Sequence, residues 1–369
     1  MFLRSILQPW RIKTAITRYF FLLLFMCIIP AKIANAAMVE KTHIGPQIVS
    51  ALPIEGLEAG RHHFYLQAGW TNTGQPYTIP IVILQGEKAG KNTKRLLLNA
   101  GTHGDELNGL RVLHRLASEI NTKDFSGQIV MITGLNQPGM RANSRYFVGA
   151  SGGGFKADLN RNFPGKGAGG STEEKYLNDI WLGGGFDKFD AVIDMHTQTR
   201  GTKYPLFVFV DYRNKKAKEM AFALMPDVIK DDEGEEGTLE TVMVAKNIPA
   251  VTLEIGGPKQ FQNTLIDRAV LGVQNVLRLL EMVDQPVMKP FKAPITGTRY
   301  SNVKANIGGV SVIKVDLLQK VKKGQIVAEQ YNPFGELVEI YKAPHNGIIL
   351  AVATDPLREA GSMLVRILR

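Results

Sequence analysis

A histidine and a glutamate three residues apart stand in the glycine-rich stretch NAGTHGDELNG (99–109). The apolar run RLLL precedes this stretch, and LRVLHRLASEI, which has helical spacing, follows it. His103 and Glu106 are therefore predicted in a turn between a strand and a helix, where both side chains can face one point. Zinc accepts imidazole nitrogens and carboxylate oxygens, and a hydrolytic zinc site has three protein ligands and an open position.

A third ligand has to come from elsewhere in the chain, which contains seven histidines. His196 is the candidate because it ends the apolar, strand-like run FDAVIDMH (189–196). The sequence therefore predicts that one zinc ion is held by His103, Glu106 and His196. For the His-x-x-Glu pair taken alone, a capping or turn motif without a metal stays open.

A carboxylate at the end of another apolar run could serve as a base. Glu254 closes the strand-like run AVTLEI (250–255), where a buried charge is costly unless it has a partner or a function. As a general base, Glu254 would take a proton from water and pass it to a leaving nitrogen. A salt-bridged glutamate at a strand end is the alternative, and the residue alone does not decide between them.

Two loops add groups that could bind a carboxylate or a carbonyl. LNQPGMRANSRYF (135–147) contains Arg145, and DLNRNFPG (158–165) contains Asn160 and Arg161. A guanidinium can bind a carboxylate through two hydrogen bonds and can polarise a carbonyl oxygen. Ordinary loop hydrogen bonding is the alternative for all three side chains.

The elements that must position these residues alternate between about residues 80 and 285. The strand-like runs are PIVIL, RLLLNAG, GQIVMITGLN, FDAVIDMH, LFVFV and AVTLEI. Segments with helical spacing separate them, and the longest, FQNTLIDRAVLGVQNVLRLLEMV, repeats apolar residues every three or four positions. This alternation predicts an α/β fold with a mixed, mainly parallel sheet and helices on both faces. Ligands of such sheets bind beyond the carboxyl ends of the strands.

After QPVMKP (285–290) the pattern changes to short β-type runs separated by turns. We therefore predict a catalytic domain over 37–289 and a small all-β domain over 290–369, similar to a barrel sandwich. Two further loops are notable. The segment 148–172 is glycine-rich and longer than a simple connection requires, and KDDEGEEGT (230–238) is predicted to be an acidic surface loop.

The first residues resemble a secretory signal peptide. A basic lead is followed by the apolar run YFFLLLFMCII (19–29) and by small residues, which predicts cleavage after Ala36 and a periplasmic or secreted protein. An uncleaved membrane anchor is the alternative, although the run is shorter than a bilayer span requires. Removal of residues 1–36 takes away five basic residues, which lowers the formal charge from +10 to +5.

The composition excludes several protein classes. The only cysteine, Cys27, lies in the predicted signal peptide, so the mature chain would have no disulfide, no thiol nucleophile and no zinc ribbon. The remaining positive charge forms no basic stripe with interleaved aromatic residues, so nucleic-acid binding is not expected. No stable membrane span is expected after cleavage.

The motifs GTHGDE, NQPGMR–SRY, DLNRNFPG, DMHT and TLEIGG occur in one order along the chain. Together they resemble the succinylglutamate desuccinylase/aspartoacylase family, which is related to zinc carboxypeptidases, over roughly residues 90–285. The resemblance implies zinc bound by His103, Glu106 and His196, with Glu254 as base and proton shuttle. Further roles are implied for Arg145 (carbonyl polarisation), Asn160 and Arg161 (substrate carboxylate), and Asp158 and Asp194 (support of the ligands).

The function predicted from these residues is zinc-dependent hydrolysis of an amide bond in a small substrate with a free carboxylate. N-acyl amino acids and short peptides both fit, and export favours a peptide. A carboxypeptidase or murein-peptide amidase is one alternative, and a binding protein that kept the fold without catalysis is another. The family resemblance also implies an aromatic side chain supplied by the β-rich segment, for which Tyr331 is a candidate without motif support.

Overall fold

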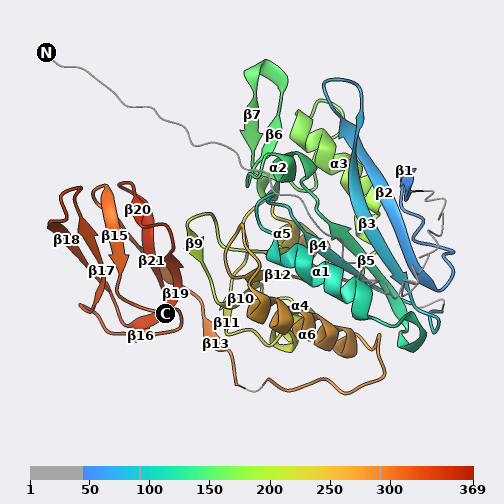
Figure 1. The fold of residues 1–369 in the computed structure, drawn as a ribbon. Coiled ribbons are helices and arrows are strands. Elements are labelled where there is room, and N and C mark those ends of the chain that lie inside the picture. The colour runs from blue at the N-terminus through green and yellow to red at the C-terminus, as the bar shows by residue number, and fades with distance from the viewer. Residues whose placement is uncertain (1–44, 91–92, 291) are drawn as a thin grey trace, which may run out of the picture. The chain divides into compact units, whose positions relative to one another are not determined.

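A ten-stranded sheet forms the centre of the fold (Figure 1), with strand order β1-β2-β3-β5-β4-β8-β12-β10-β11-β13. The structure is a computed structural model that describes residues 45–90, 93–290 and 292–369, so the predicted signal peptide lies outside the described residues. The strands of this sheet are β1 (Gln47–Val49), β2 (Gly60–Trp70), β3 (Pro76–Gln85), β4 (Lys94–Ala100), β5 (Gly127–Thr133), β8 (Ala191–His196), β10 (Leu206–Val210), β11 (Val228–Asp231), β12 (Ala250–Ile255) and β13 (Ile295–Gly297).

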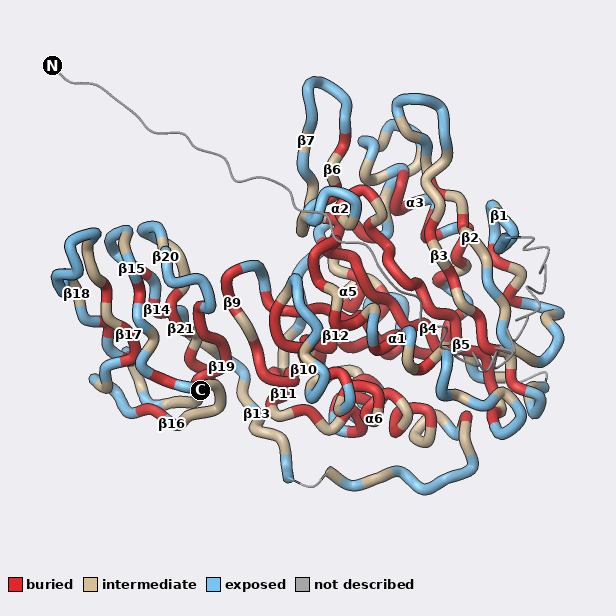
Figure 2. The backbone as a smooth tube through the Cα atoms, viewed as in Figure 1, coloured by how far each residue is buried: buried red, intermediate tan, exposed pale blue. Residues whose placement is uncertain are grey.

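The sheet is mixed, as predicted, and its centre is parallel. Strands β5, β4, β8 and β12 run parallel to one another, whereas β12 and β10 are antiparallel, as are β2 with β3 and β3 with β5. Every residue of β5 and β8 is buried, which explains why these strands are continuous apolar runs in the sequence. Figure 2 shows the buried backbone at the centre of the large sheet in red.

The sequence identified only residues 80–84 at the antiparallel side of the sheet, but the structure has a long β2–β3 hairpin there. Strand β2 has the sequence GRHHFYLQAGW, and most of its residues are exposed or half-buried. A strand with one partly solvated side contains polar residues at alternate positions, so it does not stand out as an apolar run.

Helices cover both faces of the sheet, which confirms the prediction. Helices α1 (Asn108–Glu119), α4 (Lys215–Ala223) and α6 (Asn263–Leu279) pack into one apolar core. Helices α3 (Thr172–Gly184) and α5 (Leu239–Ala245) pack into a second core on the other face. The amphipathic periods of the sequence place these helices correctly because each one buries a single apolar stripe.

Beyond residue 297 the chain forms two antiparallel sheets, which agrees with the predicted β-rich character. One has the order β14-β21-β19-β16 and the other β18-β17-β15-β20. The first strand after residue 290, β13, pairs with β11 of the large sheet. The strands are β14 (Tyr300–Lys304), β15 (Gly309–Ile313), β16 (Lys320–Val321), β17 (Ile326–Tyr331), β18 (Leu337–Lys342), β19 (Gly347–Ala353), β20 (Leu357–Arg358) and β21 (Met363–Leu368).

The two parts of the chain are joined by a strand pair and a shared apolar cluster. The short strand β9 (Thr202–Lys203) leaves the region of the large sheet and pairs with β19. Tyr204 and Phe207 pack in one buried cluster with Leu350 and Leu368. The β-rich segment therefore contacts the chain next to the carboxyl end of β8.

The glycine-rich loop 148–172 is partly ordered into a small hairpin of β6 (Phe147–Gly149) and β7 (Phe155–Ala157). Helix α2 (Gln137–Arg141) precedes the hairpin, and a short helical turn over Leu159–Arg161 follows it. In the described ranges, no helix is long and apolar enough to cross a membrane.

Candidate metal centre and pocket

The candidate residues gather because three neighbouring parallel strands end at the same edge of the sheet. His103 lies just after β4, His196 is the last residue of β8, and Glu254 is near the end of β12. The strands are adjacent in the order β4-β8-β12, and His196 and Glu254 are register partners. The candidate site therefore lies beyond the carboxyl ends of parallel strands, where ligands of such sheets bind.

A close backbone approach explains why residue 104 of the GTHGDE motif is glycine. A Cβ atom on Gly104 would lie 2.2 Å from the backbone carbon of Gly139 in α2, so only glycine fits. The Gly104 N–H donates to the Arg145 carbonyl oxygen at 3.3 Å. This contact holds the motif against the loop that carries Arg145.

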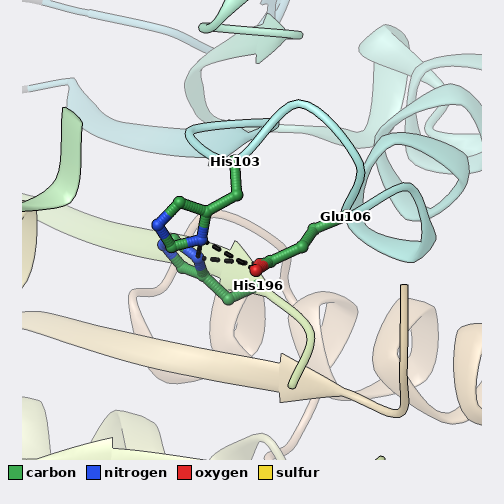
Figure 3. A group of neighbouring side chains, drawn as sticks. All are labelled: His103, Glu106 and His196. Atoms are coloured by element: carbon green, nitrogen blue, oxygen red, sulfur yellow. Dashed lines mark hydrogen bonds and ion pairs between the residues drawn. The ribbon is translucent and has the colours of Figure 1, made fainter. Parts of the chain in front are cut away.

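His103, Glu106 and His196 converge on one point (Figure 3), with ligand atoms within 4.8 Å of one another. His103 Nδ1 lies 2.8 Å from Glu106 Oε1, and His196 Nδ1 lies 3.1 Å from Glu106 Oε2. The two Nδ1 atoms are 3.1 Å apart, and all three side chains are buried. Figure 3 shows the two rings side by side, with the carboxylate meeting them at their Nδ1 atoms.

Two aspartates hold the imidazoles in the orientation that a metal requires. His196 Nε2–H donates to Asp194 Oδ2 at 2.9 Å, and His103 Nε2–H donates to Asp158 Oδ1 at 3.1 Å. These bonds place the proton on Nε2, which leaves each Nδ1 with a lone pair directed to the common point. Asn99 also donates to Asp194, at 2.7 Å. Two nitrogens and a carboxylate with supported orientations fit a divalent metal such as zinc.

Arg145 lies between the ligand carboxylate and a supporting aspartate. Its Nη1 donates to Glu106 Oε1 at 3.0 Å, and its Nη2 donates to Asp158 Oδ2 at 3.2 Å. Burial alone would lower the pKa of Arg145, but the two carboxylates raise it, so the guanidinium stays charged. The sequence placed Arg145 at this site, and the structure puts it beside the candidate metal ligands.

Glu254 carries a carboxylate oxygen without a partner. Its Oε2 is buried and has no hydrogen-bond donor within the described part of the chain. Burial raises the pKa of Glu254 to about 7. No basic side chain among the described residues forms an ion pair with Glu254. The structure therefore does not show the salt bridge that was the alternative role for this glutamate.

A pocket of about 240 Å³ opens in front of these groups and is lined by every one of His103, Arg145, His196 and Glu254. Asn160 and Arg161 line the same pocket, so the two candidate substrate-binding residues are also near the site. The Asn160 amide oxygen accepts from the Leu239 N–H at 3.2 Å, whereas the guanidinium of Arg161 pairs with Glu235. Arg161 is exposed where it lines the pocket.

Most residues of the pocket wall that lies away from the candidate metal ligands, here called the far wall, were not predicted from the sequence. The lining includes Gln198, Tyr204, Phe209, Asp232, Glu235, Glu240, Thr252, Tyr300 and Arg366. The acidic loop that was predicted to be a surface loop therefore borders the pocket. The aromatic residue from the β-rich segment is Tyr300 rather than Tyr331, whose hydroxyl donates to Glu329 within β17. Glu240 differs from the rest of its apolar segment only in being a carboxylate, and the sequence does not show which side of α5 faces the pocket.

Hydrogen bonds of one side-chain amide connect the segment after β4 with the end of β12. Asn108, at the start of α1, donates to the Ile255 carbonyl oxygen at 2.7 Å and to Gln262 Oε1 at 2.8 Å. The Gln262 N–H donates back to Asn108 Oδ1 at 3.0 Å. Asn108 thereby fixes the distance between the His103–Glu106 motif and the strand of Glu254.

Replacing Asp194 by Asn should weaken metal binding by roughly tenfold to a hundredfold, because the His196 ring loses its charged hydrogen-bond acceptor. Metal affinity measured by competition with a chelator checks this expectation. Asp187→Asn is the matched control, because Asp187 is exposed and pairs with Lys246 away from the site. Equal affinities of the Asp194 and Asp187 variants would contradict the assigned role.

Comparison with known proteins gives consistent matches. A family model described as the succinylglutamate desuccinylase/aspartoacylase catalytic domain matches residues 92–280. A curated relative, the N-alpha-acetyl-L-2,4-diaminobutyric acid deacetylase of Halomonas elongata, is 23% identical over 304 residues, which cover 79% of this chain and 86% of the relative.

Solved structures share the fold over almost their whole length. The product-bound ectoine utilization protein EutE (DoeB) of Ruegeria pomeroyi is 20% identical with a TM-score of 0.73, over 84% of this chain and 96% of that one. A succinylglutamate desuccinylase of Silicibacter sp. TM1040 is 21% identical with a TM-score of 0.74, over 86% and 97%. These matches include the β-rich segment as well as the large sheet.

Proposed function

Since the chain belongs to the succinylglutamate desuccinylase/aspartoacylase family, we propose that it is a zinc-dependent hydrolase that cleaves the amide bond of a small N-acyl amino acid. The observation that carries the proposal is the unpartnered, buried Oε2 of Glu254 in the same pocket as the His103–Glu106–His196 group. Its curated relative is named as a deacetylase of an acetylated diamino acid, which supports an acyl group on nitrogen as the scissile part.

Each group of site residues has a separate role in the proposed hydrolysis. A divalent metal held by His103, Glu106 and His196 would supply Lewis-acid activation of water and of the acyl carbonyl. Glu254 takes a proton from the attacking water on its free oxygen and later delivers it to the departing nitrogen. Arg145, which stays charged, donates hydrogen bonds to the negative charge that develops on the carbonyl oxygen.

The substrate carboxylate would be held at the mouth of the pocket. Arg161 can form two hydrogen bonds with a carboxylate, and Asn160 lies next to it. In the structure the guanidinium of Arg161 already pairs with the carboxylate of Glu235. A substrate carboxylate would take the place of Glu235, which is exposed and can move into solvent.

Product analysis separates the candidate activities. We expect the purified enzyme to release acetate and a free amino acid from N-acetyl amino acids, detected by amine-reactive labelling. Release of C-terminal amino acids from peptides, with acetyl amino acids left intact, would favour the carboxypeptidase or murein-peptide amidase. No turnover of either class by metal-loaded protein would favour a binding protein that kept the fold.

We also propose that residues 1–36 direct export and are removed after Ala36, and that residues 37–289 carry the chemistry while 290–369 complete the pocket wall. The basic lead and the apolar run of the sequence support the first part. The contact of β9 with β19 and the presence of Tyr300 and Arg366 in the pocket support the second. The mass of the mature protein from a native host tests the cleavage site.

A further inference from the structure

We propose that the far end of the pocket, around Glu240, binds an ammonium group on the side chain of the amino acid that is released. The inference rests on the proposed function, because it assigns the leaving half of an N-acyl amino acid to a defined place. It makes cationic diamino acids, acylated on the reacting nitrogen, the preferred substrate class.

Glu240 lies beside the proposed base. It belongs to the first turn of α5, is 5% exposed and lines the same pocket as Glu254. Its Oε2 accepts a hydrogen bond from Thr252 Oγ1 at 2.7 Å. Thr252 and Glu254 are two residues apart on β12, so both side chains point to the same face, about 7 Å apart along the strand. A substrate that reaches Glu254 therefore has Glu240 within the length of an amino-acid side chain.

The groups around Glu240 favour the binding of a positively charged ligand. Burial, with smaller contributions from the nearby carboxylates of Asp232, Asp194 and Asp211, raises the pKa of Glu240 to about 8 in spite of the hydrogen bond from Thr252. No lysine or arginine of the described ranges forms an ion pair with this carboxyl. The nearby Lys230 pairs with Asp232 instead. A buried carboxyl among acidic neighbours is stabilised in its charged form when an ammonium group binds next to it.

A second, independent group in the pocket points to a ligand of this shape. Gln198 is 7% exposed, and its buried Nε2 has no hydrogen-bond partner among the described residues. The Thr199 N–H donates to Gln198 Oε1 at 2.8 Å, which fixes the amide so that Nε2 remains free for an acceptor on a ligand. A carbonyl or carboxylate oxygen would satisfy this donor, while an ammonium group would satisfy Glu240. An acylated diamino acid carries both.

The walls between these groups suit the apolar stem of such a side chain. Tyr204, Phe209 and Tyr300 line the pocket and offer apolar surface to the stem. Their faces already carry cations of the protein, since Lys230 lies over the rings of Phe209 and Tyr300. Arg366, on the same wall, would favour an acidic side chain, but its guanidinium is engaged with the Tyr204 hydroxyl, the Asn302 amide oxygen and the Tyr300 ring. Binding of the substrate side chain by Glu240 predicts a preference for cationic amino acids, whereas binding by Arg366 predicts a preference for acidic ones.

Binding of the product amino acids tests the inference without turnover. We expect the metal-loaded protein to bind L-ornithine or L-2,4-diaminobutyrate at least about tenfold more tightly than L-norvaline or L-glutamate in calorimetric titrations. Glu240→Gln should reduce this preference by about tenfold. Glu236→Gln, which changes an exposed glutamate in the loop before α5, is the matched control and should keep the preference of the unchanged protein. The same ratio measured as kcat/KM on the N-acetyl derivatives should follow the binding data.

Each outcome decides one of the two proposals. Tighter binding of norvaline or glutamate, or an unaltered preference in Glu240→Gln with its fold retained by circular dichroism, would overturn the ammonium site. Ammonium-selective binding without hydrolysis of any acetyl derivative would overturn the proposed hydrolase while supporting the site at Glu240. Equal loss of preference in the Glu236 control would assign the effect to the charge of the loop and overturn the inference.

Discussion

The variant Glu254→Gln should lose roughly a hundredfold to ten-thousandfold in kcat, because the amide cannot accept a proton from water. Its metal content should equal that of the unchanged protein, since Glu254 is not among the three candidate ligands. The substitution keeps the size of the side chain, so the buried space around it stays filled. Steady-state kinetics on an N-acetyl amino acid, together with metal analysis of the same preparation, gives the result.

The control for this experiment is Glu219→Gln, which changes an exposed glutamate on α4. That variant should retain the kcat of the unchanged protein. If Glu254→Gln also kept full activity with a normal metal content, the base would have to be another group, and the unpartnered Oε2 would have a structural explanation only.

Metal removal should abolish turnover, and either His103→Ala or His196→Ala should reduce the metal content from about one per chain to near zero. The reason is that each variant leaves two ligands in a site that requires three. Loss of the metal also leaves the buried carboxylates of Glu106 and Asp194 without its positive charge. The metal-free protein should therefore unfold at a lower temperature than the loaded one.

Metal analysis, thermal unfolding and activity of the same samples check these expectations. His114→Ala is the control, because His114 is exposed on α1 and does not belong to the candidate ligand group. Restoration of activity by added zinc in chelator-treated protein, but not in the His196 variant, would complete the assignment. Full activity after verified metal removal would contradict it.

The candidate site residues could be found in the sequence because they lie at or just after strand ends. His103, His196 and Glu254 each stand at the end of a continuous apolar run, and adjacent parallel strands bring such positions together. The helices on both faces followed from amphipathic spacing in the same way. Local sequence patterns are sufficient to predict such positions when simple crossovers connect neighbouring strands of the sheet.

The residues that form the far wall could not be found in this way. Tyr300 and Arg366 come from strands more than a hundred residues after the metal ligands in the sequence, and a pairing between β9 and β19 brings that segment to the pocket. Strand β9 has two residues, too few to show any period. Glu240 is hidden for another reason, since its importance depends on which side of α5 meets β12.

The separation of the metal ligands from the far wall has a consequence for how such a protein can diversify. The proposed ligands and base lie on the inner strands or in the turn directly after β4, where a substitution disturbs packing. By contrast, Asp232, Glu240, Tyr300 and Arg366 lie on a loop, a short helix and the β-rich segment. Mutation can alter these outer positions and leave the hydrolytic groups intact. A few changes at these outer positions would therefore alter which molecules fit the pocket, while the groups proposed for hydrolysis keep their places.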